Sequence, residues 1–326
     1  MNKNLVKVLM FTIGFSFIST SCSLFKNDNV DNNAAGTPTP VSTETPGINS
    51  AEPSATSTVE PINTDSSGSN SSDEKSTKSY KPVIVLPYGN EMERGYVMGG
   101  SKGSQWIDVF QLKIPKTDVE KEVDIDLVRG GEVYKFYSAG KLIGEGKGSK
   151  PVYTASEGSG SEVLYVNIKP FPQVKEDLVI GINGDWNAVP SMPRKQTDNL
   201  DKYLSPVINA TGFDKAASIK DVTLVDIDGD GAEEAIVNVV SSPSGSSPDG
   251  VENKSLVVLE KKVNGEVKYI KLHESYFNIT PYAYDLNGDG KMEIVLEGSA
   301  HEEYFICAYV IDGGESKPVV SFYEGA

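Results

Sequence analysis

The chain has 326 residues, with 46 acidic against 30 basic side chains and a formal net charge of −16 at pH 7. This length suffices for one or two ordinary domains. The acidic balance disfavours binding to nucleic acid or to anionic lipid, because both carry negative charge. Cations are the partners that such a surface favours.

The first segment has the layout of a secretory signal peptide. Lys3 and Lys7 precede the apolar run Val8–Ile18, and small polar residues follow it. The run is much shorter than the roughly 20 residues that a membrane-spanning helix needs, so we predict that residues 1–21 are an export signal.

Cys22 stands where this signal ends, in the sequence Ile18-Ser19-Thr20-Ser21-Cys22. The segment resembles a bacterial lipobox. The resemblance implies cleavage before Cys22, a diacylglycerol on its sulfur, and anchoring to the outer face of the cell membrane. The alternative is a plain secreted protein. The only other cysteine is Cys307, so a lipidated Cys22 leaves no intramolecular disulfide. Because Cys307 lies in an apolar run, we expect it to be a core residue.

Residues 22–79 are predicted to be the lipid anchor and a disordered linker. Within them, Asn27–Ser79 contains no Leu, Phe, Tyr or Trp and is dominated by Ser, Thr and Pro. Such a segment cannot bury enough apolar surface to offset the entropy of ordering it. We therefore expect a tether that holds a folded part away from the membrane.

From Tyr80 onward, short aromatic and β-branched runs alternate with Gly, Asp, Asn and Pro, which is typical of strands. The runs predicted as strands are Pro82–Leu86, Trp106–Ile114, Val133–Tyr137, Lys141–Gly144, Val163–Ile168, Leu178–Ile182, Val222–Val225, Ala235–Val240, Ser255–Lys261, Tyr269–Leu272, Ala283–Tyr284, Glu293–Glu297, Tyr304–Ile311 and Val319–Tyr323. Short helical turns are predicted only at Asp198–Leu204 and Phe213–Ile219. The fold class is therefore all-β. We expect an N-terminal β domain or degenerate blades at residues 80–175, and a second β region at residues 176–326.

Two segments of the second region repeat one another. The sequence Leu224–Val237 matches Ala283–Leu296 once one residue is inserted, and the two starts lie 59 residues apart. Such a period suggests propeller-type blades or stacked β units. A weaker relative, Val179–Asn187, keeps Asn183 and Asp185 but lacks the leading Asp and the ninth-position acid. We interpret it as a degenerate repeat without metal.

The two repeats carry oxygen-bearing side chains at alternate positions. Positions 1, 3, 5 and 9 are Asp226, Asp228, Asp230 and Glu234 in the first loop, and Asp285, Asn287, Asp289 and Glu293 in the second. Calcium prefers six to eight oxygen ligands, and a tightly curled loop directs alternate side chains to one point. The carbonyls of Ala232 and Lys291 at position 7 would complete each shell, and the glycines between the acids would allow the sharp turns. The sequence thus predicts two structural Ca²⁺ sites. The alternative is a pair of acidic hairpin turns without metal.

Position 12 separates the loop families that share this opening. An EF-hand needs Glu there and a dockerin usually has Asp, each before a helix, whereas this chain has Val237 and Leu296 in apolar runs. Strands on both sides and an acid at position 9 resemble the calcium loops of FG-GAP/VCBS repeats, found in integrin α-chain propellers and bacterial surface proteins. The resemblance implies a partial or small β-propeller-like C-terminal region. The tail Leu286–Tyr323 also resembles that of clostridial lipoproteins.

No catalytic motif stands out. His273 and His301 form no His-Glu-x-x-His pair, Gly158–Ser161 lacks the pattern of a nucleophile elbow, and Gly99–Gly103 precedes a strand, which favours a hairpin over a phosphate loop. No spacing identifies a carboxylate pair for sugar cleavage. Trp106 and Trp186 are candidates for a ligand-contact platform, with core packing as the alternative.

The function indicated by these features is binding, adhesion or scaffolding by a calcium-stabilised surface lipoprotein. Its partners would be the membrane, through Cys22, and a protein or glycan of the cell envelope. The alternative is an envelope glycan hydrolase or lyase with structural calcium.

Overall fold

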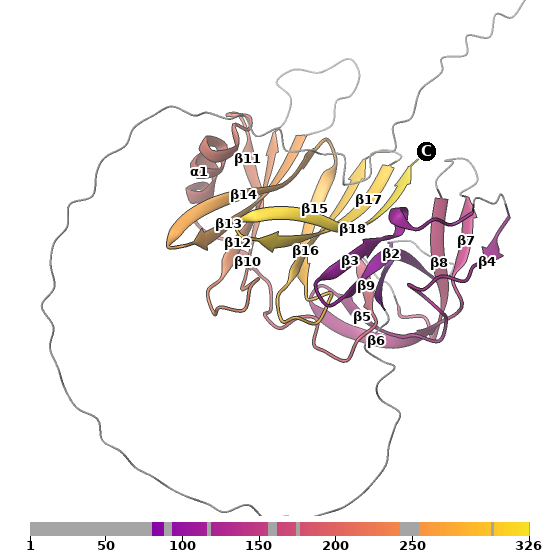
Figure 1. Cartoon of the computed structure of the whole chain (residues 1–326). Coiled ribbons are helices and arrows are strands. Elements are labelled where there is room, and N and C mark those ends of the chain that lie inside the picture. The colour runs from indigo at the N-terminus through magenta and orange to yellow at the C-terminus, as the bar shows by residue number, and fades with distance from the viewer. Residues whose placement is uncertain are drawn as a thin grey trace, which may run out of the picture. The chain divides into compact units, whose positions relative to one another are not determined.

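The structure is a computed structural model that describes residues 80–87, 93–115, 119–155, 162–173, 177–241, 254–300 and 303–325. The predicted signal peptide, Cys22 and the predicted linker lie outside these residues, as do Gly158–Ser161 and His301. Within the described part the chain is all-β with three antiparallel sheets and one α-helix, which confirms the predicted fold class (Figure 1).

The first sheet has nine strands in the order β3-β2-β1-β9-β5-β6-β8-β7-β4. Its strands are β1 (Lys81–Leu86), β2 (Arg94–Lys102), β3 (Gln105–Asp108), β4 (Lys121–Glu122), β5 (Val133–Ser138), β6 (Lys141–Gly148), β7 (Val152–Ala155), β8 (Glu162–Lys169) and β9 (Val179–Ile182). Strand β2 also pairs with β8, so the sheet closes on itself as a partial ring. A 3₁₀ turn, Val109–Gln111, follows β3.

The other two sheets are antiparallel meanders in which each strand pairs with the next one along the chain. The first meander contains β10 (Arg194–Gln196), β11 (Ser218–Val225), β12 (Glu234–Ser241), β13 (Lys254–Val263) and β14 (Glu266–Ser275). The second contains β15 (Asn278–Tyr284), β16 (Glu293–Ala300), β17 (Glu303–Asp312) and β18 (Glu315–Gly325). Helix α1 (Asp201–Thr211) lies between β10 and β11 in the chain and ends at Gly212, whose left-handed φ of 70° suits a residue without Cβ.

Strand β1 is buried on both faces. Its alternate residues Ile84 and Leu86 belong to one apolar cluster, which also contains Phe136, while Val83 and Val85 belong to a second cluster that extends into both meanders. Successive strand residues point to opposite faces, so one strand can serve two cores. The first sheet and the meanders therefore share apolar packing.

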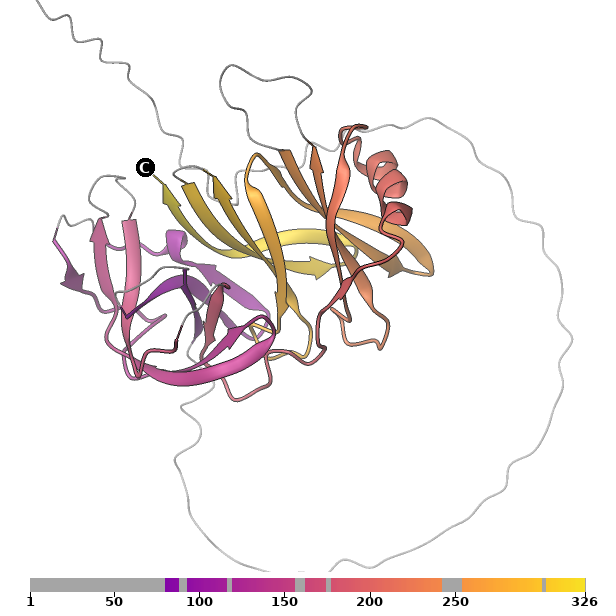
Figure 2. The ribbon, with the colours of Figure 1, turned by 180° about the vertical axis from the view of Figure 1, so that it is seen from behind.

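The first meander is covered on both faces too. Tyr203 and Val207 of α1 pack against one face, with Val222 and Val237 beneath them. The opposite face, which includes Ile236, joins the apolar cluster shared with the second meander. Figures 1 and 2 show α1 beside the first meander, and the second meander between the first meander and the nine-stranded sheet. The acidic loops occupy the matching β11–β12 and β15–β16 turns.

Most strand predictions are confirmed, with a few corrections. Phe213–Ile219 is not helical, because residues 213–217 form a turn that leads directly into β11. The strand predicted over Trp106–Ile114 ends at Asp108, whose side chain accepts from the Phe110 N–H and caps the 3₁₀ turn. The hairpin predicted at Gly99–Gly103 is present as the β2–β3 turn. Strand β9, which follows the expected boundary between residues 175 and 176, pairs with β1 and β5 of the nine-stranded sheet.

Candidate metal and ligand site

The two acidic loops have the same internal hydrogen bonds. In the first loop, the Asp226 carboxylate accepts from the backbone N–H of Gly229 at 2.8 Å and of Gly231 at 2.9 Å. Glu234 Oε2 accepts from the Ile227 N–H at 2.9 Å. The acids at positions 1 and 9 thus hold the turn from its two ends.

The second loop repeats this pattern. Asp285 accepts from Gly288 at 2.7 Å and from Gly290 at 3.0 Å, and Glu293 accepts from the Leu286 N–H at 2.8 Å. The four loop glycines have φ between 76° and 86°, a left-handed conformation that costs other residues about 1–2 kcal/mol. The predicted need for glycine at Gly229, Gly231, Gly288 and Gly290 is confirmed.

The remaining predicted ligands lie at the exposed tips. Asp230 and Asp289 each accept from the N–H at position 7, of Ala232 at 2.8 Å and of Lys291 at 2.9 Å respectively. The position-7 carbonyls stay predicted ligands. In the first loop, oxygens of Asp226, Asp228 and Glu234 lie within 4.8 Å of one another, close enough to share one cation.

The first loop already contains a positive charge that the sequence interpretation missed. Lys261 of β13 donates to Asp228 Oδ2 at 2.5 Å and to Glu234 Oε1 at 3.0 Å. Burial alone would lower the pKa of Lys261, but these two bonds and charges outweigh it and raise the pKa. The bond from Lys261 lowers the pKa of Asp228. A basic residue two positions after the buried run Leu256–Leu259 was the signal available in the sequence.

The second loop has a different charge balance. Glu293 is only 3% exposed, and its Oε1 has the Asn287 amide at 3.4 Å. Burial raises the pKa of Glu293 to about 8, and the charges of Asp289 and Asp285 add to this effect. Burial also raises the pKa of Asp285. Ionisation of such a buried carboxyl is unfavourable by itself, and a nearby cation stabilises the ionised form.

The loops form a hydrogen-bonded row. The Met292 N–H donates to the Ile227 carbonyl at 2.7 Å, which joins the second loop to the first. On its other side, the Asp285 N–H donates to the Ala188 carbonyl at 2.8 Å. The row therefore runs from residues 183–188 through residues 285–293 to residues 226–234, which differs from their order in the chain.

Trp186 supports the middle member of the row. Its indole Nε1–H donates to the Asp285 carbonyl at 2.7 Å. Its ring lies against Gly288, where an added Cβ would be 2.8 Å from ring carbons, and the Lys81 ammonium lies 4.4 Å from the ring centroid. Trp186 is thus a positioning residue for the second loop.

The other polar residues of the degenerate repeat contact β5. Asn183 donates to the Val133 carbonyl at 2.9 Å, and Asp185 lies 3.8 Å from the Lys135 ammonium. Both contacts are made to β5 of the nine-stranded sheet.

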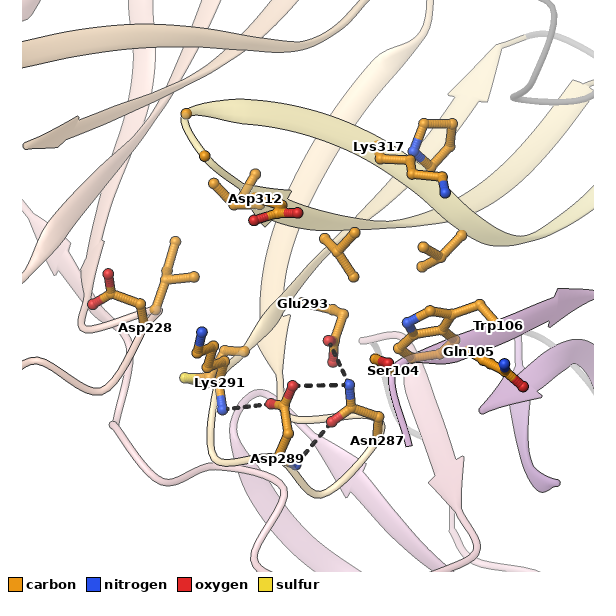
Figure 3. A pocket seen from close by; sticks show the side chains of 18 of the residues that line it. Ser104, Gln105, Trp106, Asp228, Asn287, Asp289, Lys291, Glu293, Asp312 and Lys317 are labelled. Carbon is orange, nitrogen blue, oxygen red and sulfur yellow. Dashed lines mark hydrogen bonds between the residues drawn. The ribbon is translucent and has the colours of Figure 1, made fainter. Parts of the chain in front are cut away.

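A cleft of about 840 Å³ opens beside the acidic loops. Trp106 and Gln105 line it from β3, while Asp312 and Lys317 line it from β17 and β18. Figure 3 shows Asn287, Asp289 and Glu293 pointing toward one another at this cleft. Asp228, Lys261 and Lys291 complete its charged lining. The cleft thus combines an aromatic ring with donors and acceptors of both charges.

His273 and Cys307, the histidine and the cysteine within the described residues, are packed in the core. Burial lowers the pKa of His273 to about 4, and its Nδ1 lies 3.0 Å from the Tyr309 hydroxyl. Cys307 is fully buried, as predicted. Neither residue lines the cleft beside the acidic loops.

Comparisons with protein-family models, with curated proteins and with solved structures found no match. Among the described helices, none has the length and apolar character needed to cross a membrane.

Proposed function

We propose that this protein is a calcium-stabilised β-repeat binding module, and that its ligand is a glycan of the cell envelope held in the cleft beside the acidic loops. The observation that carries this proposal is the meeting of the second acidic loop with Trp106 at one cleft. The predicted lipid anchor at Cys22 would place the module on the outer face of the membrane.

Calcium suits the second loop on the chemistry of its donors. Asp285, Asn287, Asp289 and Glu293, with the Lys291 carbonyl, offer only oxygen, which calcium prefers over nitrogen or sulfur ligands. A bound ion would neutralise the buried Glu293 and Asp285 carboxyls. The first loop is the second candidate calcium site. Its donors would be Asp226, Asp228, Asp230, Glu234 and the Ala232 carbonyl.

The setting of the loops supports an FG-GAP/VCBS-like repeat over an EF-hand. Strands β12 and β16 begin at position 9 of each loop, where an EF-hand continues into a helix. The meanders β11–β14 and β15–β18 have the four-stranded antiparallel order of a propeller blade. We therefore propose two propeller-like repeats packed against the N-terminal sheet.

Thermal unfolding of the full chain with calcium and with chelator tests the metal assignment. At a calcium concentration about 100 times the dissociation constant, binding stabilises the folded state by about 2.7 kcal/mol. For a folded part of this size, chelation should then lower Tm by roughly 5–10 °C. Asp228→Ala combined with Asp289→Ala should abolish the response, while Asp126→Ala, at an exposed acid that pairs with Arg129, should retain it. An unchanged Tm with chelator contradicts the assignment.

Binding to purified envelope glycans tests the cleft. Flat aromatic rings contact sugars over a large area at low entropic cost, so Trp106→Ala should weaken glycan binding at least tenfold. Phe110→Ala is the matched control. Phe110 is 48% exposed, lies in the 3₁₀ turn that follows β3, and does not line the cleft. Equal affinities of the two variants would contradict the proposed site, and glycan turnover would favour a hydrolase.

A further inference from the structure

The two acidic loops differ at one matched position on the neighbouring strand. In the first meander Ala235 pairs with Glu260, so the next pair along this antiparallel ladder places Lys261 opposite Glu234. In the second meander Ile294 pairs with Tyr309, so Val310 lies opposite Glu293. Lys261 and Val310 are therefore the same position in the two repeats.

The Lys261 ammonium contacts the acids of the first loop in the way that a bound cation would. It lies against the acids at positions 3 and 9, Asp228 and Glu234, at 2.5 and 3.0 Å. The Lys261 side chain is only 11% exposed and that of Glu234 only 5%. Calcium binds carboxylate oxygens at about 2.3–2.6 Å, so the ammonium and an ion compete for the same oxygens.

The valine brings no such charge to the strand position opposite Glu293. An isopropyl group can neither donate a hydrogen bond nor neutralise Glu293. The group that approaches Glu293 Oε1 is the neutral amide of Asn287 at 3.4 Å. The nearest acids, Asp285 and Asp289, add negative charge.

We propose that Lys261 is a built-in cation that takes the place of calcium in the first loop, so that the protein binds one Ca²⁺, at the second loop. This inference rests on the proposed calcium binding at the second loop and deepens it by fixing the number of ions. One residue, Lys or Val opposite the position-9 Glu, decides whether a loop closes on its own lysine or on a metal.

Calorimetric titration of the full chain with Ca²⁺ tests the inference through stoichiometry. The unmodified chain should take up one equivalent. Lys261→Met keeps the aliphatic stem and removes the charge, and should raise the uptake to two. Lys261→Arg is the matched control, because it keeps the charge, and should remain at one.

The reciprocal change is Val310→Lys. It places an ammonium opposite Glu293, at a position that lines the cleft, and should lower uptake to zero. Circular dichroism of each variant checks that the strands are retained. A destabilised Lys261→Met chain whose Tm rises more with added calcium than the Tm of the unmodified chain also supports the inference.

The outcomes separate this inference from the proposed function. Two equivalents on the unmodified chain, or one on Lys261→Met beside one on the unmodified chain, would overturn the role of Lys261. No uptake by the unmodified chain with one equivalent on Lys261→Met would overturn the second-loop site while supporting the role of Lys261. No uptake by either chain would overturn both.

Discussion

Gly288 and Gly290 offer a comparison that isolates the contact between Trp186 and the second acidic loop. Their φ angles are 82° and 83°, so replacing either by alanine imposes the same left-handed strain, about 1–2 kcal/mol. Their surroundings differ. A Cβ at Gly290 has no heavy atom within 4 Å, whereas one at Gly288 is 2.8 Å from the ring carbons Cδ2 and Cε3 of Trp186.

The Trp186 ring cannot move away from an added Cβ at Gly288 without a loss of stability. Moving it breaks the 2.7 Å hydrogen bond from its Nε1–H to the Asp285 carbonyl, and such a bond contributes about 1 kcal/mol. Overpacking typically costs about 1–3 kcal/mol. We therefore expect Gly290→Ala to lose about 1–2 kcal/mol of unfolding free energy and Gly288→Ala to lose about 2 kcal/mol more, with a further fall in Tm of roughly 4–8 °C.

Urea unfolding at saturating calcium, followed by circular dichroism, measures both losses. In a Trp186→Ala background the extra loss of Gly288→Ala should vanish, because the clashing ring is gone. Equal losses for the two alanine variants in the original background would refute the reasoning. So would an extra loss at Gly288 that persists without Trp186.

Three further predictions concern the core and the contact between the meanders. The pKa of His273 is about 4 in the folded state against roughly 6.5 in the unfolded state. Between these values the unfolded chain binds one proton more, so stability falls by up to about 3 kcal/mol as the pH decreases from about 6.5 to 4. His273→Phe should remove this part of the pH dependence of the unfolding free energy, and an unchanged profile would contradict the prediction. Asn238 is fully buried and donates to the Ile279 carbonyl of the second meander at 2.8 Å, so Asn238→Ala should cost about 1–2 kcal/mol in urea unfolding, more than the exposed-site change Asp126→Ala. The buried Cys307 should not react with a thiol reagent in native Cys22→Ser protein but should react fully in denaturant; rapid labelling of the native protein would disprove its core placement.

The strands were predictable where apolar runs alternate with turn residues, as in Val133–Tyr137 and Val319–Tyr323. Strand β2 was missed because Gly95, Gly99 and Gly100 interrupt its run. Those glycines are required by packing, since a Cβ at Gly95 would lie 2.6 Å from Ile84. Close contact across the nine-stranded sheet therefore selects residues that local strand propensity disfavours.

The acidic loops were predictable in position and in turn geometry, because alternating acids and glycines are local features of the chain. The partners of the loops were not. Lys261 reaches the first loop only through the β12–β13 ladder, and Trp186 reaches Asp285 across 99 residues of sequence. The register between strands determines both contacts, and a single sequence does not specify that register.

The row of three loops has a consequence for biosynthesis. Its middle member is the one that the ribosome makes last, because residues 285–293 follow both neighbours in the chain. Until Asp285 and Met292 exist, the carbonyls of Ala188 and Ile227 lack the donors that they have in the finished protein. A nascent chain that stops before residue 285 therefore lacks the segment that joins the two flanking members of the row.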